Sequence, residues 1–197
     1  MIVNNVKLLR FKSKDLKVLR KITERREGFT NDDLIEVLNG QTEVGFKYKS
    51  HFFAMFAQLF CTIAEVIISE FADKGREAMV NAVKKYGEER GRRIAEIVKS
   101  QGEELNLKNF FIYSDLDAKS TLKYTPKIVD GNLEIVGRDC VFCNGCKEWE
   151  KVEYGQIYCE YIDTSILKGY NPNLKIEVPS TLTKGNKRCV LRYLVQE

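Results

Sequence analysis

The chain has 197 residues, a net charge of +4, 44% hydrophobic residues and 30% charged residues. This length suits one domain with a small appendage, and the balance of residues suits a packed core. So modest a charge does not by itself indicate a nucleic-acid partner. Six cysteines without a recognisable secretory signal indicate reduced thiols, metal ligands or reactive groups rather than disulfides, so we expect a cytoplasmic protein.

We predict a basic N-terminal helical segment over residues 1–45 and a single α+β domain over residues 46–197. Leu16, Leu19 and Ile22 recur at helical spacing among lysines and arginines, which indicates an amphipathic helix with a solvated charged face rather than a nucleic-acid surface. Thr30 and Asp33 predict the start of a short helix, which we expect to end at Gly40.

Two long helices are expected next. Residues 52–68 are apolar over nearly the length of a membrane span, but they contain Gln58 and Glu65, and a charge inside a bilayer is costly. We therefore predict a core or dimer-interface helix, compatible with a homodimer, and no membrane partner. The second helix is predicted from Asp73 to Gly102.

Three small residues of this second helix are spaced four apart and share one face. They are Gly87, Gly91 and Ala95. Glycine costs up to about 1 kcal/mol relative to alanine inside a helix, so two glycines indicate close approach of another helix or of a ligand.

The C-terminal half changes to turns and short apolar runs. The pattern predicts strands over 109–114, 120–130 and 133–137, helices over 146–154 and 156–168, and a final hairpin of 172–181 and 188–196. Asp130-Gly131-Asn132 indicates a hairpin turn. The fold class is therefore α+β: N-terminal helices including two long ones, followed by a mostly antiparallel sheet with one or two helices before the final hairpin.

The cysteines are the strongest chemical feature. Cys140, Cys143 and Cys146 have two-residue spacing, and Cys159 and Cys189 follow. Such spacing suits zinc or an iron–sulfur cluster, although the fourth cysteine and proline of a cluster motif are absent. All five cysteines are candidate metal ligands. The two alternatives are that the protein has no cofactor or that it binds zinc. Buried cysteines that act as small hydrophobic side chains are the other interpretation.

General acid–base chemistry must depend mainly on carboxylates, tyrosines or thiols, because His51 is the only histidine. Asp163 lies four residues after Cys159, so a helix places both on one face. The pair suits activation of water or tuning of a thiolate, and Asp163 equally suits local helix-end hydrogen bonds.

The C-terminal residues resemble the L-2-amino-thiazoline-4-carboxylic acid hydrolase family. The resemblance is carried by Cys140-Val-Phe-Cys143, Trp149, Tyr158-Cys159-Glu160, Asp163, Tyr170-Asn171-Pro172, Leu174 to Glu177, Thr181-Leu182, Gly185 and Cys189. Val178 and Val190-Leu191 depart from the arginine and the Asp-Phe pair usual in the family. There is also a distant resemblance to vinyl-reductase-type small-ligand domains, in which Cys159, Glu177 and Cys189 would match zinc ligands.

The resemblance implies a small-molecule hydrolase that opens a cyclic or amide-like C–N bond, with no nucleic-acid partner and no required cofactor. It places Cys159 and Asp163 at the chemistry and Cys143, Glu177, Thr181 and Cys189 in the substrate pocket. The alternative is a non-enzymatic small-ligand or zinc-binding sensor. A reactive Cys159 requires a lowered pKa, which Arg138 or Arg188 would favour and which Glu160 and Asp163 would oppose.

Overall fold

The computed structural model describes residues 30–45, 49–116 and 118–194. The chain divides into two compact units, residues 1–49 and residues 50–197. The helix predicted around Leu16 to Ile22 lies outside the described residues.

Helix α2 (Asn31–Val44) begins where the sequence predicts. The Asp33 amide donates to Oγ1 of Thr30 at 3.2 Å, and the Thr30 amide donates to the Asp33 carboxylate at 2.6 Å, which closes a capping box. The predicted end at Gly40 is wrong, because the helix continues to Gly45, whose φ of 58° terminates it. A helical glycine lowers stability, but only a residue in the left-handed region ends the helix here.

The second unit contains the remaining elements. They are α3 (Phe52–Ser100), α4 (Leu107–Ile112), α5 (Ala118–Thr121), β1 (Leu122–Val129), β2 (Asn132–Cys140), α6 (Val141–Glu148), α7 (Val152–Tyr170), β3 (Lys175–Ser180), the 3-10 turn η1 (Leu182–Lys184) and β4 (Cys189–Leu194).

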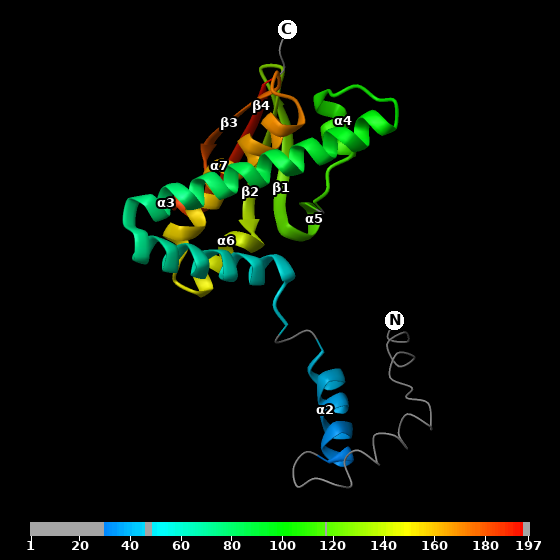
Figure 1. Ribbon diagram of the computed structural model, residues 1–197. Helices are drawn as coiled ribbons and strands as arrows, with labels where there is room; N and C mark the ends of the chain where they lie inside the picture. Colours follow the sequence, from blue (N-terminus) through cyan, green and yellow to red (C-terminus); the bar gives the residue numbers. More distant parts are fainter. Residues whose placement is uncertain (1–29, 46–48, 117, 195–197) are drawn as a thin grey trace. The chain divides into compact units, whose positions relative to one another are not determined.

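The four strands form one antiparallel sheet in the order β1-β2-β4-β3 (Figure 1). Asp130 and Gly131 both have positive φ, at 50° and 75°, and join β1 to β2 through the predicted turn. Strands β3 and β4 form the predicted final hairpin around η1. The α+β class is confirmed.

Helix α3 is a helical hairpin of two arms, which we call the first arm (residues 52–71) and the second arm (residues 73–100). Ala72 breaks the helix with φ 49° and ψ −125°, and the two arms run back along each other (Figure 1). A Cβ on Gly75 would lie 2.3 Å from the Ile67 carbonyl oxygen, so the bend requires glycine there. The two long helices that the sequence predicts are confirmed.

Among the described helices, α3 alone has the length and composition of a membrane span, with a mean hydropathy of 1.9 in its most apolar window. Of the residues in that window, 22% are buried within the protein. Small side chains of the first arm, Ala57, Cys61 and Ala64, are fully buried against the rest of the domain.

Helix α7 lies between the sheet and α3, and its crossing with the second arm is a backbone contact. A Cβ on Gly91 would lie 2.0 Å from the Ile166 carbonyl oxygen, and one on Gly169 would lie 2.2 Å from the Glu88 carbonyl oxygen. A Cβ on Gly87 would meet Ser165 at 2.6 Å. The predicted close approach of another helix to this glycine face is therefore confirmed.

One predicted strand is wrong. Residues 109–114 belong to α4 and its end, because Asn106 caps that helix and accepts the Asn109 amide at 2.9 Å. The Asn109 side chain then donates to the Glu104 carbonyl at 2.9 Å, so this polar residue is satisfied while buried. The first helix after β2 also begins earlier than predicted, at Val141, and carries Cys143 and Cys146 within it.

We predict that Gly91→Ala lowers the free energy of unfolding by about 2 kcal/mol or more, because the added methyl group forces apart two helix backbones that touch. The measurement is urea denaturation followed by circular dichroism. Gly40→Ala is the matched control, since no atom lies within 4 Å of its added Cβ. Equal stability of Gly91→Ala and the natural chain would contradict this packing.

Candidate active site

The face of α7 turned toward the sheet carries Cys159 and Asp163, one helical turn apart. Both residues keep intermediate solvent exposure, yet their polar atoms have protein on nearly every side. We call Cys159, Asp163 and the groups that interact with them the acid–thiol cluster. The surrounding protein, more than the residual exposure, sets the electrostatics of these groups.

Two further thiols join the acid–thiol cluster from the sheet. Cys140 ends β2, and Cys189 begins β4 opposite Gly137, on the same strand face as the buried Leu191 and Tyr193. The Asp163 carboxylate raises the pKa of both thiols, and Coulomb interaction falls with distance, so the three groups are neighbours. Burial is the larger cause for each, and together these effects raise the pKa of Cys189 to about 12.

Asp163 is the acid of the acid–thiol cluster. Burial raises its carboxyl pKa to about 6, and the nearby Arg90 guanidinium opposes this only in part. Among residues 30–45, 49–116 and 118–194, the Asp163 carboxyl makes no hydrogen bond and no ion pair. Solvent therefore reaches the carboxyl oxygens. A carboxyl with a pKa raised by burial and a specific charge nearby is a candidate for a functional role.

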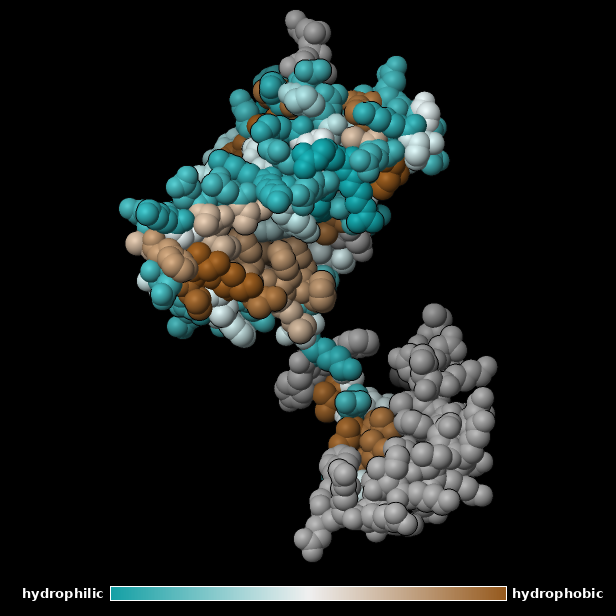
Figure 2. All heavy atoms as spheres, in the orientation of Figure 1, coloured by the Kyte–Doolittle hydropathy of each residue, from teal (hydrophilic) through white to brown (hydrophobic). Residues whose placement is uncertain are grey.

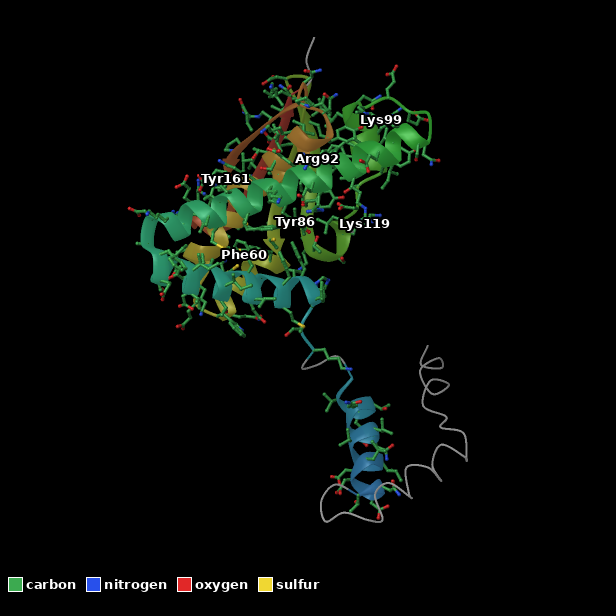
Figure 3. All side chains as sticks on the ribbon, in the orientation of Figure 1. Phe60, Tyr86, Arg92, Lys99, Lys119 and Tyr161 are labelled. Carbon is green, nitrogen blue, oxygen red and sulfur yellow. The ribbon has the colours of Figure 1, made fainter. Side chains whose placement is uncertain are left out.

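Arg90 reaches the site from the second arm of α3. Its Nε and Nη2 donate to the two oxygens of Asp115 at 3.0 and 2.5 Å, a bidentate pair that holds the guanidinium in place. The guanidinium also lies 5.6 Å from the centre of the Tyr86 ring, labelled in Figure 3. Arg90 therefore brings a fixed positive charge toward Asp163.

The Cys159 thiol is not activated. Burial raises its pKa well above the ordinary value, and the charges of Cys140, Asp163 and Cys189 add to this effect. A hydrogen bond with Thr183 opposes the shift, but burial dominates. The lowered pKa that a reactive Cys159 requires is absent, because the residue lies inside α7 rather than at its N-terminus.

Aromatic rings form the wall beside Cys159. Tyr158 stacks on Phe142 with ring centroids 4.6 Å apart and meets Phe56 and Phe60 edge-on at 5.6 and 5.5 Å. Phe60 is labelled on the first arm in Figure 3. Burial raises the pKa of the Tyr158 hydroxyl, so this group stays protonated near neutral pH. The charge of Asp163 adds to this rise, so the Tyr158 hydroxyl lies in the neighbourhood of that carboxyl.

Thr181 and Thr183 line the site from η1, and both are buried. Their hydroxyl groups are hydrogen-bonded to each other at 3.2 Å, and Thr183 continues this chain to Cys159. Thr181, predicted as a pocket residue, thus reaches Cys159 through Thr183. Cys143 is fully buried on α6 and adds to the charges felt by Cys189.

Glu177 lies apart from this group. It is exposed on β3, where its carboxylate accepts from Nη1 of Arg192 at 3.2 Å. Arg192 also binds Glu134 at 3.0 Å, and Arg192 alternates along β4 with the inward-facing Leu191 and Tyr193. The structure therefore places Glu177 on the opposite face of the sheet from Asp163, a separation that pleated strands impose on neighbouring residues.

The cysteine spacing does not translate into a metal cage in the part of the chain that the structure describes. No three His, Cys, Asp or Glu side chains there are gathered so as to hold a metal ion. Cys146 instead turns away to Cys61 of the first arm, with the two sulfur atoms 3.3 Å apart. Cys143 and Cys146 lie three residues apart on one face of α6, and both are buried in the protein.

Four contributors were missed by sequence reasoning: Arg90, Tyr158, Thr183 and Tyr193. Tyr193 shares the inner face of β4 with Cys189, so strand alternation contained the signal. No pattern near Arg90 in the sequence indicated its role, because the crossing of α3 and α7 alone brings its charge near Asp163.

The fold and site define an α+β domain with a helical hairpin, a four-stranded antiparallel sheet and an acid–thiol cluster. The chain belongs to the L-2-amino-thiazoline-4-carboxylic acid hydrolase family, whose model matches residues 52–193. This match confirms the resemblance seen in the C-terminal residues and extends it over all of α3. No curated protein matches the chain.

One similar solved structure is a trafficking protein particle complex subunit 3 from Naegleria fowleri covalently bound to palmitic acid. The two chains are 15% identical, with a TM-score of 0.45, over 74% of this chain and 95% of that one.

We predict that Asp163→Asn stabilises the protein above pH 6 and leaves its stability unchanged below pH 4. The folded-state pKa of about 6 lies above the ordinary 3.8, so the folded state binds the proton more tightly. The contribution of Asp163 to the free energy of unfolding is complete below pH 3.8 and is lost as the pH rises through about 6. The gain is at most about 3 kcal/mol, because one pKa unit corresponds to about 1.4 kcal/mol. Urea denaturation across this pH range measures it, and a gain that is independent of pH would contradict it.

We also predict that Cys159 alkylates more slowly than free cysteine near neutral pH, and that Asp163→Asn accelerates the reaction. Removal of the carboxylate lowers the pKa of the Cys159 thiol and increases its thiolate fraction. Timed iodoacetamide labelling with mass-spectrometric mapping measures both rates. Glu177→Gln, on the other face of the sheet, is the charge-matched control and should leave the rate unchanged.

Proposed function

We propose that the protein is a hydrolase that opens a C–N bond of a small cyclic, amidine-like molecule of the L-2-amino-thiazoline-4-carboxylate type. The observation that carries the proposal is Asp163. This carboxyl has a pKa of about 6, has no hydrogen-bond partner in the described chain, and lies beside the thiols of a domain from this hydrolase family. Such a group is ionised and basic near neutral pH, as a general base must be.

In the proposed reaction, Asp163 takes a proton from water as the water oxygen bonds to the ring carbon between nitrogen and sulfur. The protonated Asp163 gives this proton to the ring nitrogen. The new hydroxyl group then passes its own proton through Asp163 to the same nitrogen, as the C–N bond breaks and a C=O bond forms. The net change is the addition of one water molecule. The guanidinium of Arg90, whose Nε and Nη2 are already bound to Asp115, provides positive charge near Asp163 for a substrate carboxylate.

The neutral thiols have a supporting role in this proposal. The raised pKa of Cys159 and Cys189 keeps both sulfurs protonated, so neither competes with water as a nucleophile. Cys159, Cys189 and the aromatic ring of Tyr158 would line the pocket and exclude bulk water. Asp163 is thereby proposed as the catalytic residue, and Cys159 as a pocket residue held by Thr183.

We predict that Asp163→Asn lowers kcat for L-2-amino-thiazoline-4-carboxylate about 10²–10⁴-fold, the usual contribution of a general base. In the natural protein kcat/KM should rise with pH through about 6 and then level off, since only the ionised carboxylate accepts the proton. Ring opening can be followed by the release of a new amine group, because the C–N bond is the bond that breaks.

Two variants serve as controls for this experiment. Glu177→Gln should leave kcat unchanged, because Glu177 lies across the sheet. Cys159→Ser should retain most of the activity, whereas a loss equal to that of Asp163→Asn would assign the chemistry to the thiol. Binding of the compound without turnover would favour the ligand-sensing alternative, and stoichiometric zinc in protein purified without chelator would favour its zinc-binding form.

A further inference from the structure

The outward face of the first arm of α3 is apolar, whereas the outward face of a surface helix is ordinarily polar. From Phe52 to Val66 the large exposed side chains of this arm are all apolar, with exposed fractions between 44% and 82%, and the exposed Glu70 follows at the end of the arm. We call these residues the apolar stripe: Phe52, Met55, Leu59, Ile63 and Val66. Figure 2 shows them as a continuous brown band over the first arm.

Two polar side chains in the middle of the same arm are directed into the protein. The Gln58 amide donates to the Glu148 carboxylate at 3.3 Å, and Glu65 is ion-paired with Lys151. Small residues such as Ala57 and Ala64 fill the buried face. An ordinary surface helix has the opposite arrangement, so the stripe is a face prepared for a partner.

The spacing of the stripe is symmetric about Leu59. Met55 and Ile63 lie four residues to either side of it, and Phe52 and Val66 lie seven residues to either side. In an antiparallel pair of identical helices related by a two-fold axis, a residue before the axis meets the residue equally far after it. With the axis at Leu59, every member of the stripe therefore meets another member.

The area suits a second copy. The exposed parts of the five side chains amount to on the order of 600 Å² per chain, at the upper end of what monomers leave uncovered. Two copies would bury about 1,200 Å², the lower limit of a standard specific interface. The stripe contains no charge, so pairing with itself brings no like charges together. A membrane would cover the same face, but it would not require symmetric spacing.

From the apolar outward face, the symmetric spacing and the area, we infer that the protein forms a two-fold symmetric homodimer through the first arms of α3, packed antiparallel with Leu59 at the axis. Each arm is fixed to its own domain by Cys61 and the small residues, so the two domains lie on opposite sides of the helix pair. The interface is separate from Asp163 and does not depend on the proposed reaction.

Sedimentation velocity of the full chain from about 1 to about 100 μM should show a dimer with a Kd in the micromolar range, as expected for an interface of this size. Leu59→Glu places two carboxylates at the axis and should weaken the dimer at least about tenfold. Ile112→Glu is the matched control, because Ile112 is an equally exposed apolar residue, at 63%, outside the stripe. Circular dichroism should show that both variants are folded.

Cysteine substitutions test the register. Leu59→Cys alone should cross-link under oxidised glutathione, whereas Met55→Cys should cross-link efficiently only when mixed with Ile63→Cys, because disulfides need Cα atoms within about 7 Å. Self-linking of Met55→Cys without its counterpart would indicate a parallel pair and overturn the proposal. A full chain that stays monomeric at the highest concentration would also overturn it, whether or not it sediments with vesicles of phosphatidylcholine and phosphatidylserine.

Discussion

The domain depends on the contact of two helix backbones, the second arm of α3 and α7. Gly87 and Gly91 on one helix and Gly169 on the other leave no room for a Cβ between them. Such close approach maximises dispersion contacts along the crossing and fixes the rotation of α7 about its axis. The Lys168–Glu88 ion pair, at 2.7 Å, lies at the edge of this crossing and adds little beyond it, because it is exposed.

The rotation of α7 determines the chemistry. With its glycine face against α3, the helix turns Cys159 and Asp163 toward the sheet, where Cys189 meets them. The same crossing brings Arg90, next to Gly91, toward the carboxylate that it partly stabilises. An acid with a raised pKa and a set of protonated thiols therefore follow from the packing of apolar helices around polar groups. The stability lost by burying Asp163 is typical of sites kept for function.

The two arms of α3 differ in how they are covered. The second arm buries one apolar face against its own domain and exposes mostly polar residues, whereas the first arm presents small residues inward and large apolar residues outward. A helix that is apolar on both sides is ordinarily buried on both sides. The bend at Ala72 folds the helix into a hairpin and so leaves the apolar face of the first arm at the surface of the domain, where the proposed homodimer would form.

Local patterns in the sequence determined the secondary structure and the class of the fold. The Thr30–Asp33 capping box, the glycine face of the second arm, the Asp130-Gly131 turn and the final hairpin were all predictable, since each depends on residues within a few positions of one another. The strand predicted over 109–114 was wrong, because the capping contacts of Asn106 and Asn109 outweigh the strand preference of the aromatic run. The family resemblance likewise lay in the C-terminal sequence.

Tertiary structure alone decided the composition of the site. Glu177 and Cys189 lie on neighbouring strands and looked equivalent as pocket residues, but the pleat and register send Glu177 to Arg192 on the far face. The cysteine triplet looked like a metal motif, yet the helical course of α6 directs Cys146 to Cys61. Whether Cys159 is reactive depended on how much protein surrounds it, and Arg90 reaches Asp163 only through a helix crossing. Burial and long-range contacts set pKa values, and neither is encoded in the spacing of residues along the chain.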